Sequence, residues 1–304
     1  MPSTQIFRRR IKSVNNTKQI TKAMEMIASI KMQKAVRTIG QARIYIQEAW
    51  NILHLLAHKV LPDNHPLIST RPFKRTAVIL ITSDRGLCGS YNTEIIKKFV
   101  QFEREKCASN TTDCNLTLGN CDVIAIGKVG AAYTRRYNIG KLIAEFKGFD
   151  NDFSIDDIIP ISKMTNGEYL ANNYDRVVVI YSHFSSSIKQ VPVVQQILPI
   201  TDEHIDMKDF WATRESTKDL DYKFEPTADQ VFDSVLIQIA RTQVYGAVLE
   251  ANASEHSARM VAMKNATDNA KDLIDELQLI YNSVRQDGIT REIAEISGAA
   301  EAMK

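Results

Sequence analysis

The sequence lacks the features that mark several broad classes of protein. Its 304 residues include only 12 glycines and 8 prolines, which favours long uninterrupted helices over many turns. Its apolar runs, such as residues 77–81, are too short to span a bilayer. The 4 cysteines make no disulfide scaffold and contain no Cys-x-x-Cys spacing that would predict a zinc site. No secretory signal is expected at the start. We therefore expect a soluble protein with reduced thiols.

Motifs for catalysis and nucleotide binding are also missing. The sequence has no HExxH, GxSxG or Walker motif. The turn Thr82-Ser-Asp-Arg-Gly-Leu-Cys-Gly89 stands where a phosphate-binding loop would carry GxGxxG, and it has Arg85 where a pyrophosphate needs bare backbone. Cys88 would need a neighbouring histidine to act as a nucleophile, and the sequence reveals none. We expect no active site, no cofactor and no metal site.

Charge is distributed unevenly along the chain. The net charge is +2, yet residues 1–43 carry ten Lys and Arg against the single acid Glu25, a local charge of +9. Residues 226–304 carry seven basic and twelve acidic residues, a local charge of −5. A basic segment can bind nucleic acid or anionic lipid, and it can also pair with an acidic helix of the same chain.

The N-terminal segment has the hydrophobic period of a coiled coil. Apolar residues recur at alternating spacings of four and three, which is the 3.5-residue period of a left-handed coiled coil. The predicted seam consists of Ala28, Met32, Ala35, Ile39, Ala42, Ile46, Ala49, Leu53, Leu56 and Val60. A stripe in a shifted phase is expected upstream, formed by Ile20, Met24 and Ile27. The helix should begin near Ser3 or Thr4 and end before Pro62.

The C-terminal segment shows the same period over a longer stretch. Its predicted seam consists of Ala228, Phe232, Val235, Ile239, Thr242, Gly246, Leu249, Ala253, His256, Met260, Met263, Thr267, Ala270, Ile274, Leu277, Tyr281 and Val284. A helix from Pro226 to about Ala302 would be roughly 115 Å long, so it needs a partner along its length. The basic N-terminal helix, antiparallel to it, is the expected partner. Beyond the seam, the spacing of Ile289, Ile293, Ile296 and Ala300 favours insertion into an apolar socket.

Between the two helices, the period switches to that of an α/β layer. Buried strands are expected at 76–82, 123–126 and 177–181, with helices at 91–106, 128–137 and 164–173. A hairpin should follow from Tyr181 to Leu198, and residues 107–120 should form a loop. We expect an α/β protein with three parts: a coiled-coil helix over 1–61, a Rossmann-like domain with a mostly parallel sheet over 75–200, and a coiled-coil helix over 222–304.

Four segments resemble the gamma subunit of F-type rotary ATP synthases. Residues 11–28 (IKSVNNTKQITKAMEMIA) resemble the opening segment of that family, and Thr82–Gly89 resembles its central signature. Residues 255–270 and 282–300 resemble its C-terminal signatures. The segments occur in the order of the family, and together with the helix–sheet–helix plan the resemblance covers essentially the whole chain.

The resemblance implies a rotor shaft without a catalytic site of its own. In that family the paired terminal helices turn inside a hexamer of alpha and beta subunits, and the α/β domain contacts the epsilon subunit and the ring of c subunits. One copy per complex would transmit torque between ion flow and ATP synthesis. The resemblance implies no nucleic-acid partner and contact with a membrane only through the complex. We expect the cytoplasmic face of a bacterial cell membrane, with the matrix side of the mitochondrial inner membrane as the alternative.

Residue roles follow from the matching motifs. The resemblance implies torque-coupling contacts at Met24, which would face Arg285, Gln286 and Thr290. It implies contact with an acidic loop of a beta subunit at Arg85 and Cys88. It implies contact with the c-ring and epsilon at Tyr222, Phe224 and Glu225.

One segment departs from the family pattern, and two other functions stay open. The loop with Cys107, Cys114 and Cys121 is longer and richer in cysteine than the family pattern, so its role is undefined, and we expect no thiol switch. An α/β enzyme with coiled-coil arms would need a ligand pocket at the strand ends. A nucleic-acid-binding coiled coil would use the basic segment, which has few aromatics besides Phe7 and Tyr45.

Overall fold

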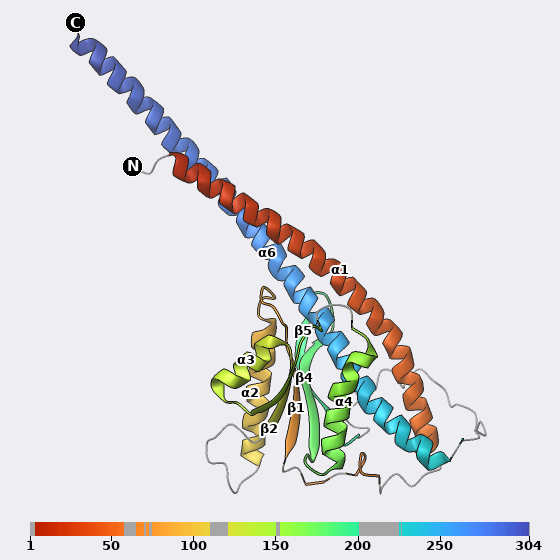
Figure 1. The fold of residues 1–304 in the computed structure, drawn as a ribbon. Helices are drawn as coiled ribbons and strands as arrows, with labels where there is room; N and C mark the ends of the chain where they lie inside the picture. Colours follow the sequence, from red (N-terminus) through yellow and green to blue (C-terminus); the bar gives the residue numbers. More distant parts are fainter. Residues whose placement is uncertain are drawn as a thin grey trace. The chain divides into compact units, whose positions relative to one another are not determined.

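The computed structural model describes residues 4–57, 65–69, 71–72, 75–109, 121–149, 153–200, 225 and 227–303 (Figure 1). These residues form two units, one from Lys31 to Ala258 and one from Met1–Ile30 together with Arg259–Lys304. The elements follow in the order α1 (Thr4–Ala57), β1 (Thr76–Ile81), α2 (Tyr91–Ser109), β2 (Cys121–Ile126), α3 (Lys128–Tyr137), β3 (Lys141–Phe146), α4 (Ile155–Leu170), β4 (Arg176–Phe184), β5 (Gln190–Leu198) and α6 (Ala228–Ala302).

The unit of residues 31–258 is built on a five-stranded sheet in the order β3-β2-β1-β4-β5. The first four of these strands run parallel, and β5 pairs with β4 antiparallel as the predicted hairpin. In the centre, Ile79 of β1 pairs with Ile124 of β2 and Val179 of β4. All six residues of β1 are buried, as expected for a parallel strand covered on both faces. The prediction of a mostly parallel α/β sheet is confirmed.

Helices cover both faces of this sheet. Because side chains alternate along a strand, β1 contributes to two cores. Val78 and Leu80 pack against Phe99 of α2 on one face. Ile79 belongs to a larger core on the other face, which includes residues of α4, the first half of α6 and the end of α1. Trp50 of α1 is 2% exposed in this second core.

Three predictions for this unit were wrong. Helix α4 begins at Ile155, nine residues before the predicted start, where Ser154 N donates to Asp157 Oδ2 over 2.7 Å as in a capping box. Residues 141–146 form the strand β3, which the sequence analysis did not predict. This strand lies at the edge of the sheet and is only partly buried, so its sequence has no clear apolar run. Helix α2 continues to Ser109, so the backbone of Cys107 is helical.

The two terminal helices are antiparallel to each other. In the unit of residues 1–30 and 259–304, Thr21 Oγ1 lies 2.8 Å from Thr267 Oγ1. Because the helices are antiparallel, two residues that lie opposite each other in this pair have numbers whose sum is about 288, as 21 and 267 do. The predicted pairing of the N- and C-terminal helices is confirmed.

The seam residues pack as the 3.5-residue period predicts. In the unit of residues 31–258, one cluster of buried residues joins the two helices, formed by Ala35, Ile39, Leu249 and Ala253. Each seam position whose side chain is described is buried or half-buried on both helices. Alanines and a glycine at these positions allow close approach of the backbones, and a Cβ added at Gly246 would lie 3.5 Å from Ile46 Cδ1.

The shifted stripe predicted near the N-terminus was wrong. Ile20, Met24 and Ile27 are 56%, 37% and 56% exposed. The buried and half-buried positions recur instead at spacings of three and four, at Thr4, Phe7, Ile11, Val14, Lys18, Thr21, Glu25 and Ala28. The helix keeps the phase of its seam, which here includes four polar residues, and the three apolar side chains are therefore left on another face.

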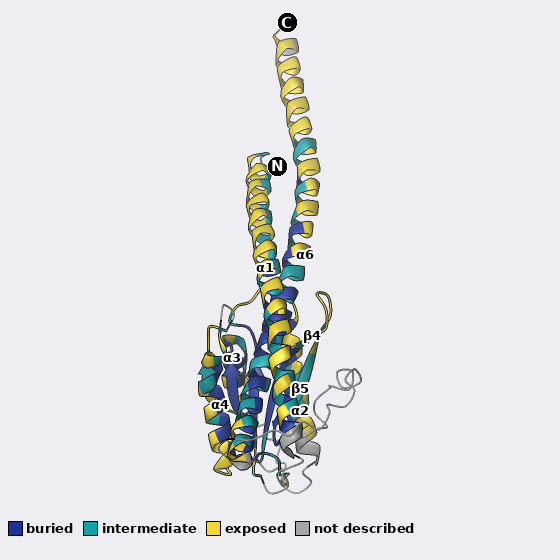
Figure 2. Cartoon of the chain, turned by 90° about the vertical axis from the view of Figure 1, so that its right-hand side faces the viewer, coloured by how far each residue is buried: buried dark blue, intermediate teal, exposed yellow. Residues whose placement is uncertain are grey.

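Helix α6 extends beyond the end of α1. The register places Val284 level with Thr4, the first described residue of α1. Every residue from 285 to 300 is exposed, and Figure 2 colours this end of α6 yellow accordingly. None of the helices among the described residues has an apolar stretch long enough to cross a membrane.

Candidate functional site

The turn after β1 is held by several hydrogen bonds to the neighbouring elements. Asp84 Oδ1 accepts a hydrogen bond from the backbone N of Lys128, over 3.0 Å, at the first turn of α3. Asp84 Oδ2 accepts another from Gly148 N over 2.8 Å. Asn92 Nδ2 donates to Ser83 Oγ over 2.7 Å, which ties the turn to α2. A carboxylate at a helix N-terminus is favoured by the helix dipole, so Asp84 holds the turn in a fixed position.

The two predicted contact residues of this turn differ in exposure. Arg85 is exposed, and next to it Leu87 is 60% exposed with a φ of 65°. Cys88 is 2% exposed, and its Sγ lies 3.2 Å from Asn92 Nδ2. Its sulfur is a thiol rather than half of a disulfide, and it faces the inside of the turn. A partner that approaches this turn therefore meets Arg85 and Leu87 first, while Cys88 shapes the loop from within.

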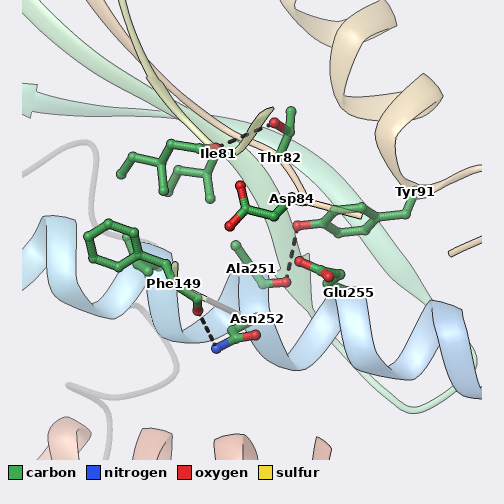
Figure 3. A pocket seen from close by; sticks show the side chains of 11 residues that line it. Ile81, Thr82, Asp84, Tyr91, Phe149, Ala251, Asn252 and Glu255 are labelled. Carbon is green, nitrogen blue, oxygen red and sulfur yellow. Dashed lines mark hydrogen bonds between the residues drawn. The ribbon is translucent and has the colours of Figure 1, made fainter. Parts of the chain in front are cut away.

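The edge of the sheet where an α/β protein binds a ligand is closed here. Because β1 lies between β2 and β4, their carboxyl ends form the switch point at which such ligands bind. Helix α6 lies across this edge, with Val248, Ala251, Asn252 and Glu255 beside the ends of β1 and β2 (Figure 3). The remaining cavity measures about 20 Å³, enough for about one water and far too small for a nucleotide.

Two hydrogen bonds fasten α6 beside this cavity. Tyr91 of α2 donates its hydroxyl to the backbone O of Ala251 over 3.1 Å, and Asn252 Nδ2 donates to the backbone O of Phe149 over 2.9 Å (Figure 3). Asp84 and Glu255 contribute carboxylates to the wall of the same cavity. Among the described residues, no group of three histidines, cysteines or acids could hold a metal ion.

The predicted coupling residues do not meet in the structure. The register places Met24 level with residue 264, and Arg285 is 21 residues further along α6, which is about 32 Å at 1.5 Å per residue. Arg285, Gln286 and Thr290 are exposed on the part of α6 that extends beyond α1. Met24 therefore does not face these residues. Their coupling roles stay predictions, which now involve two separate levels of the helix pair.

The other residues singled out from the sequence lie outside the described residues or directly beside a segment that is not described. Tyr222, Phe224 and Cys114 lie outside them, and Glu225 is described and exposed. Cys121 is buried at the start of β2, with its sulfur as a thiol rather than in a disulfide.

A set of polar residues on α6 escaped the sequence analysis. Glu250, Ser254 and Ser257 lie between the seam positions, and all three bond to the β4–β5 hairpin. Their spacing of four and three residues indicates one helical face, which was the available signal. Tyr181 of β4 belongs to the same region, where burial and then the nearby Glu250 carboxylate raise the pKa of its phenol, so it stays neutral.

Comparison with known proteins gives a full-length match. The family model described as ATP synthase matches residues 3–303. The ATP synthase gamma chain of Nitrosomonas eutropha is 38% identical over 304 residues, which cover 100% of both chains. The ATP synthase gamma chain of Nitrosomonas europaea is 40% identical over 305 residues, again with 100% of both chains covered.

Solved structures show the same fold at lower identity. A chain in the OSCP/F1/c-ring structure of the Euglena gracilis mitochondrial ATP synthase aligns with a TM-score of 0.65 at 17% identity, covering 99% of this chain and 94% of that one. A chain in the central stalk/c-ring structure of the Tetrahymena thermophila mitochondrial ATP synthase aligns with a TM-score of 0.56 at 23% identity, covering 81% of this chain and 99% of that one.

Proposed function

The chain belongs to the family of ATP synthase gamma chains, non-catalytic subunits of the central-stalk rotor, and we propose that it transmits torque between a ring of c subunits and a catalytic alpha/beta hexamer. The observation that carries this proposal is the continuation of α6 beyond its partner. A helix end with the exposed side chains Ile289, Ile293 and Ile296 needs an apolar socket in another protein. A ring of alpha and beta subunits around the helix pair would supply it.

The closed edge of the sheet also supports a non-catalytic role. The position at which an α/β enzyme would bind its ligand is filled by α6, the helix that forms the shaft. The edge of the α/β domain that could have bound a ligand is thus occupied by α6. This observation favours the rotor over an α/β enzyme with coiled-coil arms.

The proposed residue roles within the complex come from the matching family motifs, together with exposure and charge where the residues are described. Arg85 stands exposed at its turn and would pair with an acidic loop of a beta subunit, while Cys88 would support that contact from within. Arg285, Gln286 and Thr290 would contact the upper part of the hexamer, and Met24 would contact it at a lower level. Tyr222, Phe224 and Glu225 would contact epsilon and the c-ring.

The proposed location of the complex rests on the relatives of the chain. Both gamma chains compared above come from Nitrosomonas, so we propose the cytoplasmic face of a bacterial cell membrane, with one gamma chain in each complex. The chain would be held at the membrane through the c-ring and epsilon rather than by a helix of its own.

Co-expression with alpha and beta subunits tests the proposed function. The full chain should co-purify with one copy per hexamer and support ATP hydrolysis. A chain truncated after Val284 loses the unpaired end of α6 and should show lowered hydrolysis or torque. Truncation after Gly298, which keeps the three exposed isoleucines, is the matched control and should behave like the full chain. Failure of the full chain to join the hexamer would overturn the proposal.

A further inference from the structure

Residues 251–257 of α6 are all buried, the longest fully buried run of this helix, and they make polar contacts in several directions. We propose that these contacts form a collar that fixes the rotational angle of α6 within the unit of residues 31–258 and thereby transfers torque between the α/β domain and the shaft. This inference rests on the proposed rotor function. The collar comprises Glu250, Ala251, Asn252, Ser254 and Ser257 on α6.

The β4–β5 hairpin contacts one side of the collar. Ser254 Oγ donates to the backbone O of Ser182 over 2.8 Å, and Ser257 Oγ donates to the backbone O of Ser187 over 2.5 Å. Glu250 Oε2 lies 2.6 Å from His183 Nδ1. At about 100° per residue, the three α6 side chains fall within an arc of about 60°. Gln190 Nε2 also donates to Ser257 Oγ over 3.2 Å.

Two further bonds reach α6 from other directions. Ala251, whose carbonyl accepts from Tyr91 of α2, lies about 100° around the helix from Glu250. Asn252, which donates to the backbone of Phe149, lies about 200° around. The fourth direction is apolar, because Leu249 and Ala253 pack against α1. The collar thus holds the helix from three sides by hydrogen bonds and from the fourth by packing.

The polar character of the collar matters for torque. Apolar packing is non-directional, and a seam of small and flexible side chains lets a helix rotate about its axis with little loss of buried area. Hydrogen bonds weaken steeply when their angle falls below about 120°, so they define one rotational setting. Bonds placed around the axis oppose rotation in both senses. The seam therefore keeps the helices together, and the collar sets the angle of α6.

A triple variant, Tyr91→Phe, Ser254→Ala and Ser257→Ala, tests this assignment. Each change removes only a hydroxyl, and together they delete four of the six hydrogen bonds described above between α6 and the hairpin, α2 and the Phe149 segment. The matched control is Ser234→Ala with Thr242→Val, which removes two hydroxyls on α6 that donate to carbonyls of their own helix, Val231 O and Gln238 O.

The readout is the angular fluctuation of a probe attached to the α/β domain while the assembled hexamer is immobilised without nucleotide. The triple variant loses most of the collar's hydrogen bonds, so the variance of the probe's angle should rise about twofold. The control should match the wild type. ATP hydrolysis without load should stay within about twofold in both, because the collar touches no catalytic site. Equal variance in the triple variant and the control would overturn the proposal.

Two further outcomes keep this test decisive. If the triple variant fails to assemble, the three single variants are measured, and variances no greater than the control in all three would overturn the collar. If the wild-type chain itself neither assembles nor rotates, the proposed rotor function is wrong. This outcome differs from failure of the collar proposal, because the wild type and the control then fail together.

Discussion

Replacement of Gly127 by alanine should severely destabilise the α/β unit. Gly127 connects β2 to α3 with φ 100° and ψ 143°, a conformation that residues with a side chain rarely adopt. A Cβ added there would lie 2.1 Å from the backbone O of Thr82 and 2.7 Å from its carbonyl carbon. These atoms belong to the backbone of the signature turn, so they cannot move aside by a change of rotamer.

The magnitude follows from two separate costs. A residue with a Cβ held at this φ costs about 1–3 kcal/mol. Displacement of the Thr82 backbone, which donates to Ile126 O over 2.8 Å, adds the cost of overpacking, roughly 1–3 kcal/mol. Together they lower the free energy of unfolding by about 4 kcal/mol, a large share of the ~5–15 kcal/mol typical of a domain.

Urea unfolding of the full chain, followed by tryptophan fluorescence, measures this loss. Gly167→Ala is the matched control, since Gly167 lies inside α4 with no heavy atom within 4 Å of an added Cβ. That substitution should raise the free energy of unfolding by about 0.5–1 kcal/mol through helix propensity. If Gly127→Ala unfolds at the same urea concentration as the wild type, the steric argument is refuted.

Three further predictions concern stability. Trp50→Ala should lower the free energy of unfolding by about 3–5 kcal/mol, measured by chemical denaturation, because it leaves a large cavity in the core. Burial and the hydrogen bond to Asp122 raise the pKa of Tyr174. Its contribution to the free energy of unfolding is therefore complete below about pH 10 and declines above it, as the tyrosine of the unfolded chain ionises. Tyr174→Phe should flatten the dependence of the free energy of unfolding on pH between about pH 9 and 12. A double-mutant cycle with Thr21→Val and Thr267→Val, followed by circular dichroism, should give a coupling of about 1 kcal/mol. Additive effects would contradict a bond between the two hydroxyls.

The elements that sequence alone predicted are those governed by a regular period. The 3.5-residue seam from Ala28 to Leu53 predicted burial on α1, and the buried side chains follow it. The apolar run of β1 predicted a buried strand of a mostly parallel sheet. The signature turn from Thr82 to Gly89 carried the resemblance to the family. In each case the signal lies within a short window, because the backbone geometry repeats along the chain.

The tertiary structure alone decided the features that depend on distant segments. Ile20 and Met24 are apolar yet exposed, since the register with α6 selected the face that carries Thr21. Only the packing of α6 across the ends of β1 and β2 closed the ligand-binding edge of the sheet. The collar at Ser254 and Ser257 depends on backbone carbonyls of a hairpin about 70 residues away, and hydrogen bonds to backbone leave little trace in the identity of the partner. The local hydrophobic periods thus determined the helices and strands. Long-range contacts determined which faces of these elements are buried and which make the proposed functional contacts.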